Sequence, residues 1–359
     1  MEQTAYLILQ NGQVFTGKRF GADGDVTGEV VFCTSMVGYV EALTDPNYYG
    51  QIVVQTFPLI GNYGINASDF ESKNINPKAY IVYEYCQEPS NFRSEGCLDI
   101  FLKENNIIGL YDVDTRGLTK ALREGGTMNG MITSSVAEKD KYLEEIKAYK
   151  IAHAVSEASD KKSYVVKSES PEYQVVLWDM GAKQSLRNEL ANRGLELINV
   201  PYNTTAKQIM EYKADGVVIS DGPGDPADNE EIVKQIKLLL KNNIPILGIG
   251  LGHQLIALAE GAKTYKLQYG HRGGSQPVKD INSDRIYITS QNHGYAVDVD
   301  TIPENAEANY INANDKTCEG IIYKDKPVFS VQFQPISSAG PLDTGFLFDK
   351  FVSMMKGVK

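Results

Sequence analysis

Short apolar runs alternate with amphipathic segments through the second half of the chain. The expected strands lie in the segments 174–181, 195–201, 216–226 and 244–250, and the expected helices cover 182–194, 204–216, 229–243 and 251–261. Strands and helices that alternate in this way predict a parallel sheet covered on both faces. Further strands and loops are expected over 285–333, and a closing helix over 344–356. In such a sheet, ligands gather at the carboxyl ends of the strands.

The first part of the chain follows another pattern, in which strands mix with short helices. Apolar and polar residues alternate on both sides of Asn11-Gly12, which predicts a hairpin because both turn residues tolerate positive φ. Strand-like runs follow at 29–32, 51–56 and 79–83. A helix over 118–123 is expected to end at Gly125-Gly126.

A polar segment, 156–172, separates the two patterns. It is rich in serine and lysine and only weakly periodic, as an inter-domain linker should be. We therefore expect an α/β protein with a mixed α/β N-terminal domain over 1–155, a linker over 156–172, and a second domain over 173–359. The second domain is expected to hold a mainly parallel sheet flanked by helices.

Composition narrows the class of protein. The chain has 359 residues and a formal net charge of −11, so it lacks the basic surface that a nucleic-acid partner requires. The N-terminus has no signal-peptide pattern, and no apolar run approaches the length of a membrane helix. The cysteines are scattered, at Cys33, Cys86, Cys97 and Cys318, which argues against a zinc site or a disulfide framework. These features predict a cytoplasmic protein with no metal site and no nucleic-acid or membrane partner.

Residues 220–226 form a turn rich in glycine and proline at the end of an expected strand. A rigid turn of this kind can direct backbone N–H groups into a cleft, and Gly222 and Gly224 are its flexible positions. An ordinary strand-to-helix loop would have the same composition.

Residues 246–254 pass from a strand into a helix through glycines at 248, 250 and 252. This pattern resembles a nucleophile elbow, which exposes one side chain at the start of a helix. Gly250 stands at the position of that side chain and has none. A dinucleotide-binding loop is a weaker interpretation, because the glycine spacing is wrong and no acidic residue ends the next strand.

His293 lies in the segment 289–295, and a Gln-Pro pair follows a buried strand at 334–335. A single histidine is more often a hydrogen-bonded structural residue than a catalyst. These segments alone therefore assign no chemistry.

Taken together, several long segments resemble one family over the whole chain. The resemblance is carried by residues 28–64, 90–93, 112–126, 220–226, 251–267, 269–280 and 290–297. These segments are similar to the small, glutamine-hydrolysing subunit of carbamoyl-phosphate synthase. The second domain of that subunit is a class I glutamine amidotransferase.

The resemblance fails at the catalytic positions. The family has a nucleophilic cysteine where this chain has Gly250, and a general-base histidine where it has Gln334. The glutamate that orients the base is replaced by Ile336, and a first-domain serine near the glutamine by Asn47. Neither glycine nor glutamine can do the work of the residue it replaces. The resemblance therefore implies that no catalytic residue remains and that glutamine hydrolysis has been lost.

Other family positions remain compatible with binding. The glutamine-binding or oxyanion candidates that the resemblance implies are Asn47, Gly222, Gly224, Leu251, Gln254, Gly294 and Tyr295. Those that contribute only backbone groups are equally explained by the needs of folding. The chain itself is expected to hold no cofactor, since the family's ATP and magnesium sites belong to the large subunit.

The expected function is that of a small subunit supporting ammonia-dependent carbamoyl phosphate synthesis by a large subunit, in pyrimidine or arginine biosynthesis. One alternative is a regulatory subunit that senses glutamine or another amino acid without turnover. Another is an amidohydrolase that uses an unrecognised nucleophile. Cys318 has no histidine nearby in the sequence, His253 belongs to the family's structural pattern, and neither Ser290 nor Ser338 sits at the bend.

Overall fold

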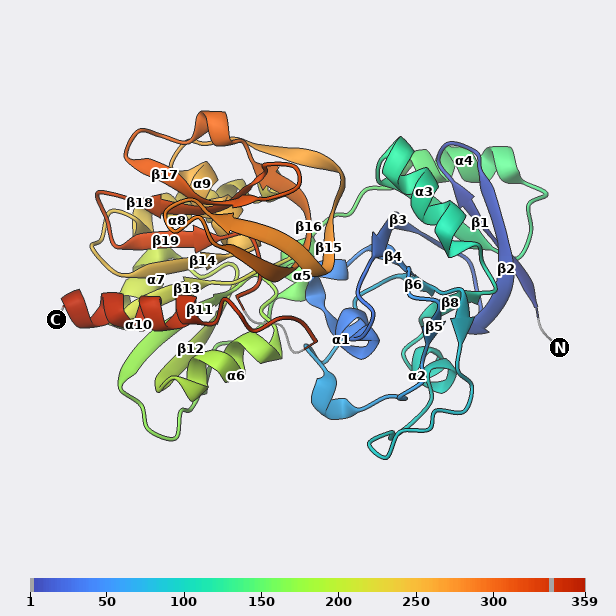
Figure 1. The fold of residues 1–359 in the computed structure, drawn as a ribbon, viewed down its shortest axis with the longest axis horizontal. Helices are drawn as coiled ribbons and strands as arrows, with labels where there is room; N and C mark the ends of the chain where they lie inside the picture. The colour runs from blue at the N-terminus through green and yellow to red at the C-terminus, as the bar shows by residue number, and fades with distance from the viewer. Residues whose placement is uncertain (1–2, 336–338, 359) are drawn as a thin grey trace. The chain divides into compact units, whose positions relative to one another are not determined.

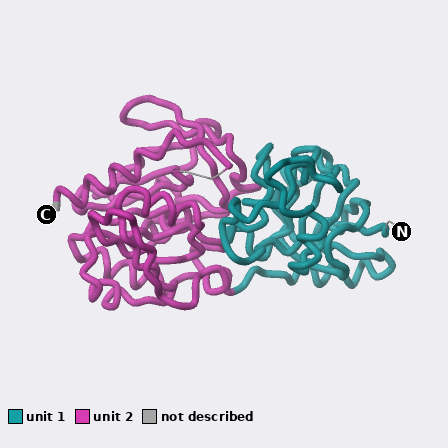
Figure 2. Tube along the Cα trace, turned by 90° about the horizontal axis from the view of Figure 1, so that it is seen from below, with its two compact units in different colours: residues 1–152 teal, residues 153–359 magenta. Residues whose placement is uncertain are grey.

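The computed structural model describes residues 3–335 and 339–358. The chain divides into two compact units, Met1–Ala152 and His153–Lys359, which are coloured separately in Figure 2.

The first unit is built on a closed barrel (Figure 1). Its strands, in barrel order, are β1 (Thr4–Leu9), β2 (Val14–Gly21), β8 (Ile108–Tyr111), β6 (Ala79–Ile81), β4 (Gln51–Gln55), β3 (Val26–Cys33) and β9 (Met128–Thr133). A small sheet pairs β5 (Leu59–Ile60) with β7 (Glu84–Tyr85). The helices are α1 (Tyr39–Thr44), α2 (Leu98–Glu104), α3 (Thr115–Gly125) and α4 (Lys139–Ala148), with short 3₁₀ turns η1 (Pro46–Tyr48) and η2 (Ala67–Asp69).

The local expectations for this unit are confirmed, with one helix longer than expected. β1 and β2 form the expected antiparallel hairpin, and Gly12 has a φ of 85° in its turn. The expected helix begins at Thr115 because the side chain of Asp114 accepts a 2.8 Å hydrogen bond from the N–H of Gly117. It ends before Gly126, whose φ is 84°.

The second unit is built on a ten-stranded sheet. Its strands, in sheet order, are β10 (Tyr164–Val166), β12 (Leu195–Pro201), β11 (Tyr173–Asp179), β13 (Gly216–Ile219), β14 (Ile246–Ile249), β19 (Val328–Val331), β18 (Cys318–Tyr323), β17 (Ala306–Asn312), β15 (Thr264–Asp280) and β16 (Ile286–Val297). Adjacent strands from β12 through β19 are parallel. Beyond β19 the pairing is antiparallel. The expected strands of the 285–333 region are β16, β17, β18 and β19, and they continue the sheet past β14.

Helices cover both faces of the parallel strands. Along β11, Val176 and Trp178 pack on one face, where α7 (Ala206–Glu211), α8 (Glu230–Leu239) and α9 (Leu251–Ala259) lie. Val175 and Leu177 face the other side, against α6 (Gln184–Asn192) and α10 (Phe346–Val358). Because successive strand residues point to opposite faces, a strand buried on both sides has a continuous apolar sequence. The expected fold class, an α/β protein with a helix-flanked sheet in its second domain, is confirmed.

The segment expected to link the domains, 156–172, is folded into the second unit. It includes the end of α5 (Ala154–Ala158), and its strand β10 pairs antiparallel with β12. Val166 packs against the core beside α6 and α10. The polar flanks hide a short β-prone run, Tyr164-Val165-Val166, which adds an edge strand to the sheet.

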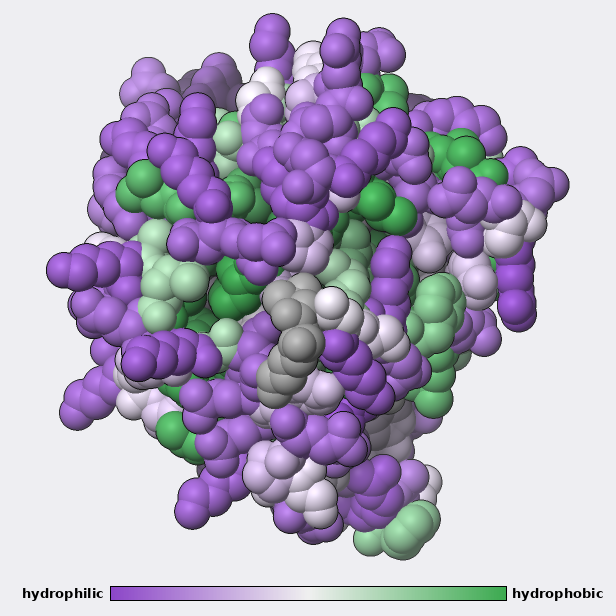
Figure 3. Space-filling view, turned by 90° about the vertical axis from the view of Figure 1, so that its left-hand side faces the viewer, coloured by the Kyte–Doolittle hydropathy of each residue, from purple (hydrophilic) through white to green (hydrophobic). Residues whose placement is uncertain are grey.

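Hydrophilic side chains predominate on the face in Figure 3, where the hydrophobic patches are small and separate. No helix in the described part of the chain is long and apolar enough to cross a membrane.

Candidate functional site

The bend after β14 has the backbone of an elbow. Gly250 joins β14 to α9 with φ 56° and ψ −111°, a conformation that side chains disfavour. Its neighbours must be small, because a Cβ at Gly252 would lie 2.2 Å from the backbone oxygen of Ile219. A Cβ at Gly248 would lie 2.5 Å from the side chain of Ile256. Packing therefore explains glycine at positions 248 and 252, independently of which residue stands at position 250.

A buried polar cluster lies beside this bend, at the carboxyl ends of the strands. Gln334 donates a 3.1 Å hydrogen bond from Nε2 to Oδ2 of Asp221, and Nζ of Lys183 lies 3.8 Å from the same oxygen. All three residues are buried. The N–H of Gln334 also donates to the carbonyl of Ser290 at 3.0 Å.

The structure thus brings together Gly250 and Gln334, two of the positions where the resemblance placed a catalytic residue. A Cβ at Gly250 would lie 2.8 Å from the Cβ of Asp221, which in turn bonds to Gln334. The third position, Ile336, lies outside the described residues.

Asp221 and Lys183 were missed in the sequence. The available signal was that Asp221 directly precedes Gly222 in the turn after β13. Lys183 lies after β11 and immediately before α6. Because β11, β13, β14 and β19 are neighbours in the sheet, their carboxyl ends converge.

The turn after β13 also meets the start of α9. A Cβ at Gly222 would lie 2.4 Å from the carbonyl oxygen of Met180 and 3.0 Å from the side chain of Leu251. Gly224 has a φ of 91°. Close packing alone therefore accounts for glycine at 222, and backbone conformation for glycine at 224.

A second set of polar contacts joins α9 to β16. Gln254 donates from Nε2 to the carbonyl of Tyr295 at 2.7 Å and to Oε1 of Gln332 at 2.9 Å. Nδ1 of His293 also donates to the Tyr295 carbonyl, at 2.7 Å. A Cβ at Gly294, between those two residues, would lie 3.2 Å from a guanidinium nitrogen of Arg272. The candidates Gln254, Gly294 and Tyr295 therefore lie in one hydrogen-bonded region.

Asn47 belongs to the first unit, in the short turn η1. Its N–H donates a 2.9 Å hydrogen bond to Oδ1 of Asp45, and the residue is buried. The proline before it and the aspartate cap fix this turn.

Two groups considered as substitute nucleophiles or bases are enclosed. Cys318 is 1% exposed, and burial raises the pKa of its thiol to about 12, which keeps it protonated at neutral pH. His253 is fully buried, and its Nδ1 lies 2.8 Å from Oγ of Ser330. Burial lowers the pKa of His253 to about 3. Neither group is placed to meet a substrate.

His271, His293 and Glu319 approach one another closely enough to suggest a metal site, with their ligand atoms within 4.8 Å of each other. The carboxamide of Gln291 lies between them instead. Its Oε1 is 3.1 Å from Nδ1 of His271 and 2.9 Å from Nε2 of His293, and its Nε2 donates to Glu319 at 3.0 Å. The amide of Gln291 therefore occupies the space between these three side chains, and an ion there would have to displace it.

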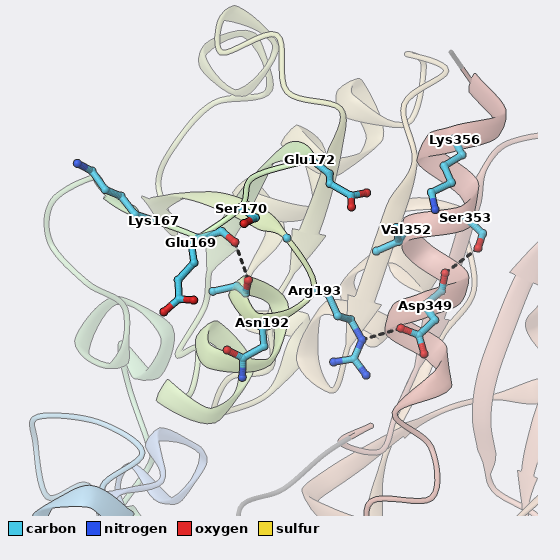
Figure 4. Close-up of a pocket in the computed structure, with 13 residues that line it drawn as sticks. Lys167, Glu169, Ser170, Glu172, Asn192, Arg193, Asp349, Val352, Ser353 and Lys356 are labelled. Atoms are coloured by element: carbon cyan, nitrogen blue, oxygen red, sulfur yellow. Dashed lines mark hydrogen bonds and ion pairs between the residues drawn. The ribbon is translucent and has the colours of Figure 1, made fainter.

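A separate polar pocket of about 840 Å³ lies between the 167–172 segment, the end of α6 and α10 (Figure 4). Its lining carries charges of both signs, from Lys167 and Lys356 on one hand and Glu169 and Glu172 on the other. Within it, Nε of Arg193 donates to Asp349 at 2.8 Å. Its described lining includes no candidate site residue.

Each of the two units matches a known protein family. Residues 7–132 match the model for the carbamoyl-phosphate synthase small chain, CPSase domain, and residues 176–354 match glutamine amidotransferase class-I. The carbamoyl phosphate synthase small chain of Fusobacterium nucleatum is 49% identical over 351 residues, which cover 96% of each chain. This chain belongs to the carbamoyl-phosphate synthase small chain family.

Other relatives in the family match just as completely. The carbamoyl phosphate synthase small chain of Clostridium perfringens is 46% identical over 97% of this chain and 98% of its own length. That of Methanocaldococcus jannaschii is 46% identical over 98% of each chain. The family resemblance read from the motifs is therefore confirmed, and the amidotransferase match spans both Gly250 and Gln334.

Proposed function

We propose that this chain is a carbamoyl-phosphate synthase small subunit that does not hydrolyse glutamine. In this proposal it acts in the cytoplasm and supports ammonia-dependent carbamoyl phosphate synthesis by a large subunit, which carries the ATP and magnesium sites. The observation that carries the proposal is the bend at Gly250, which keeps the backbone of an elbow but has no nucleophilic atom.

Amide hydrolysis through a thioester requires an attacking atom and a group that accepts its proton. Gly250 offers no attacking atom. The side-chain amide of Gln334 is not basic, and its nitrogen is already used to donate to Asp221. Loss of a nucleophile or its base costs several orders of magnitude in rate, so the expected hydrolysis is negligible.

The glycines that remain do not argue for hydrolysis. A Cβ at Gly222 or Gly252 would meet backbone atoms, so glycine is needed at both positions simply to fold the turns. The remaining role is that of a scaffold, which would hold the large subunit and close its ammonia route.

The test uses the assembled complex with its large subunit and compares nitrogen sources. We expect carbamoyl phosphate to form with ammonium and not with glutamine. The variant Gly250→Cys/Gln334→His/Ile336→Glu in the same assay tests whether restoring the three side chains recovers some glutamine-dependent synthesis. Robust synthesis from glutamine by the natural complex would refute the proposal.

A second candidate function is glutamine or amino-acid sensing without turnover. The contacts of Gln254 with Tyr295 and Gln332 favour this function, because they hold the start of α9 beside β16, where several of the expected binding positions lie. Calorimetry of the chain with glutamine tests this function, and the absence of binding heat would remove it. The third candidate, an unrecognised nucleophile, loses support because Cys318 and His253 are enclosed.

A further inference from the structure

Asp221 is the charged side chain next to the missing nucleophile. Its Cβ lies 2.8 Å from the point where a side chain at position 250 would begin, and its side chain is 6% exposed. A group attached at position 250 would therefore begin against the Cβ of Asp221, a residue that is itself buried.

We infer that Asp221 is a further determinant of the lost reaction, because its carboxylate opposes any anion formed at position 250. This inference rests on the proposed function. Glutamine hydrolysis through a thioester needs a thiolate first and an oxyanion next, and both are negative. Like charges repel strongly where water is excluded, since the effective dielectric constant there is low. Restoring the cysteine alone would thus create a poor nucleophile.

The contacts of Asp221 explain why the carboxylate is retained. Oδ2 accepts from Gln334 and lies near the ammonium of Lys183, whose side chain is 8% exposed. A buried ammonium is costly unless an anion compensates it. The carboxylate that opposes thiolate chemistry therefore also stabilises the buried lysine.

Replacing Asp221 with asparagine keeps the shape of the side chain and removes its charge. The exchange also takes away a negative charge that offsets the ammonium of Lys183, which lies 3.8 Å from Oδ2 of Asp221. Both changes favour a thiolate there, so they act in the same direction.

The experiment compares Gly250→Cys with Gly250→Cys/Asp221→Asn in the full chain. The thiolate is followed by its ultraviolet absorbance against pH, after subtraction of the same chain with Gly250. We expect the titration of the new thiol to lie at least about one pH unit lower in the asparagine variant, a roughly tenfold larger thiolate fraction at a given pH. Coincident or reversed titrations would overturn the inference.

Asp225→Asn in the Gly250→Cys chain is the matched control. Asp225 is in the same turn, where its carboxylate accepts a 2.9 Å hydrogen bond from the N–H of Ala227, a bond that asparagine can also accept. It should leave the thiol titration unchanged. If it shifts the titration as far as Asp221→Asn, the effect is one of net charge and the inference fails.

A second measurement covers the case in which Gly250→Cys does not fold. In the natural Gly250 background, Asp221→Asn should lower the melting temperature, and Lys183→Met added to it should recover more than half of the loss. If the two substitutions instead lower the melting temperature by amounts that simply add, the charge of Asp221 does not compensate that of Lys183. Neither measurement needs turnover or the large subunit, so failure here is separable from failure of the nitrogen-source test.

Discussion

Adding one methyl group at the elbow, by Gly250→Ala, should destabilise the second unit. The backbone there, with φ 56° and ψ −111°, costs a residue with a side chain about 1–3 kcal/mol. The new Cβ would also lie 2.8 Å from the Cβ of Asp221, and overpacking of a buried contact costs roughly 1–3 kcal/mol more. We expect a total loss of about 2–5 kcal/mol in the free energy of unfolding, since relaxation relieves part of the contact.

The assay is urea unfolding followed by tryptophan fluorescence. The chain has a single tryptophan, Trp178, which is fully buried in the second unit and donates from Nε1 to the carbonyl of Tyr202 at 3.0 Å. Its emission therefore reports on the unit that contains the elbow. In thermal melts the same loss should lower the midpoint by roughly 2–4 °C for each kcal/mol.

Gly357→Ala is the matched control. Gly357 lies near the end of α10 in the same unit, and a Cβ added there would meet no atom within 4 Å. This variant should keep or slightly raise the stability, because alanine favours helix. If Gly250→Ala proved as stable as Gly357→Ala, the claim that glycine relieves strain at the elbow would be wrong.

Two further predictions concern buried titratable groups. Burial alone would lower the pKa of His271, but its hydrogen bond to Asp315 and the nearby carboxylate of Glu319, 3.6 Å from Nδ1, outweigh burial and raise it to about 9. The histidine therefore adds stability that is fully present below its unfolded pKa of about 6.5 and lost as pH rises through 9. His271→Gln should lower the urea midpoint more at pH 6 than at pH 9.5, and equal losses at both would contradict this. Because Cys318 is buried and protonated, it should resist alkylation in the folded chain while the partly exposed Cys86 and Cys97 react. Mass mapping of the labelled peptides checks this, and early labelling of Cys318 would show that its surroundings open.

The sequence was sufficient for the features that depend on local pattern. Apolar runs such as Val175 to Trp178 predict strands buried on both faces, and the glycines around position 250 predict a sharp turn. In contrast, β10 was hidden by polar neighbours, since this largely exposed edge strand depends on pairing with β12, which lies some distance along the chain.

The polar cluster at the elbow could not be predicted for a related reason. Lys183 and Asp221 lie after different strands, and their proximity depends on β11 and β13 being neighbours in the sheet. Comparison with the family's motif positions does not single out Asp221. Its importance comes from its contacts with Gln334 and Lys183, which only the structure shows.

The glycines around the elbow have a consequence for how such a site changes over evolutionary time. Substitutions at Gly222, Gly248 or Gly252 would bring a new side chain against packed neighbours, so selection for a folded protein is enough to retain them. Reactive side chains have no such protection, and replacing one with glycine at position 250 relieves the backbone. A protein with this fold can therefore lose its catalytic side chains and still retain the glycine turns around the site, because those turns are needed for folding.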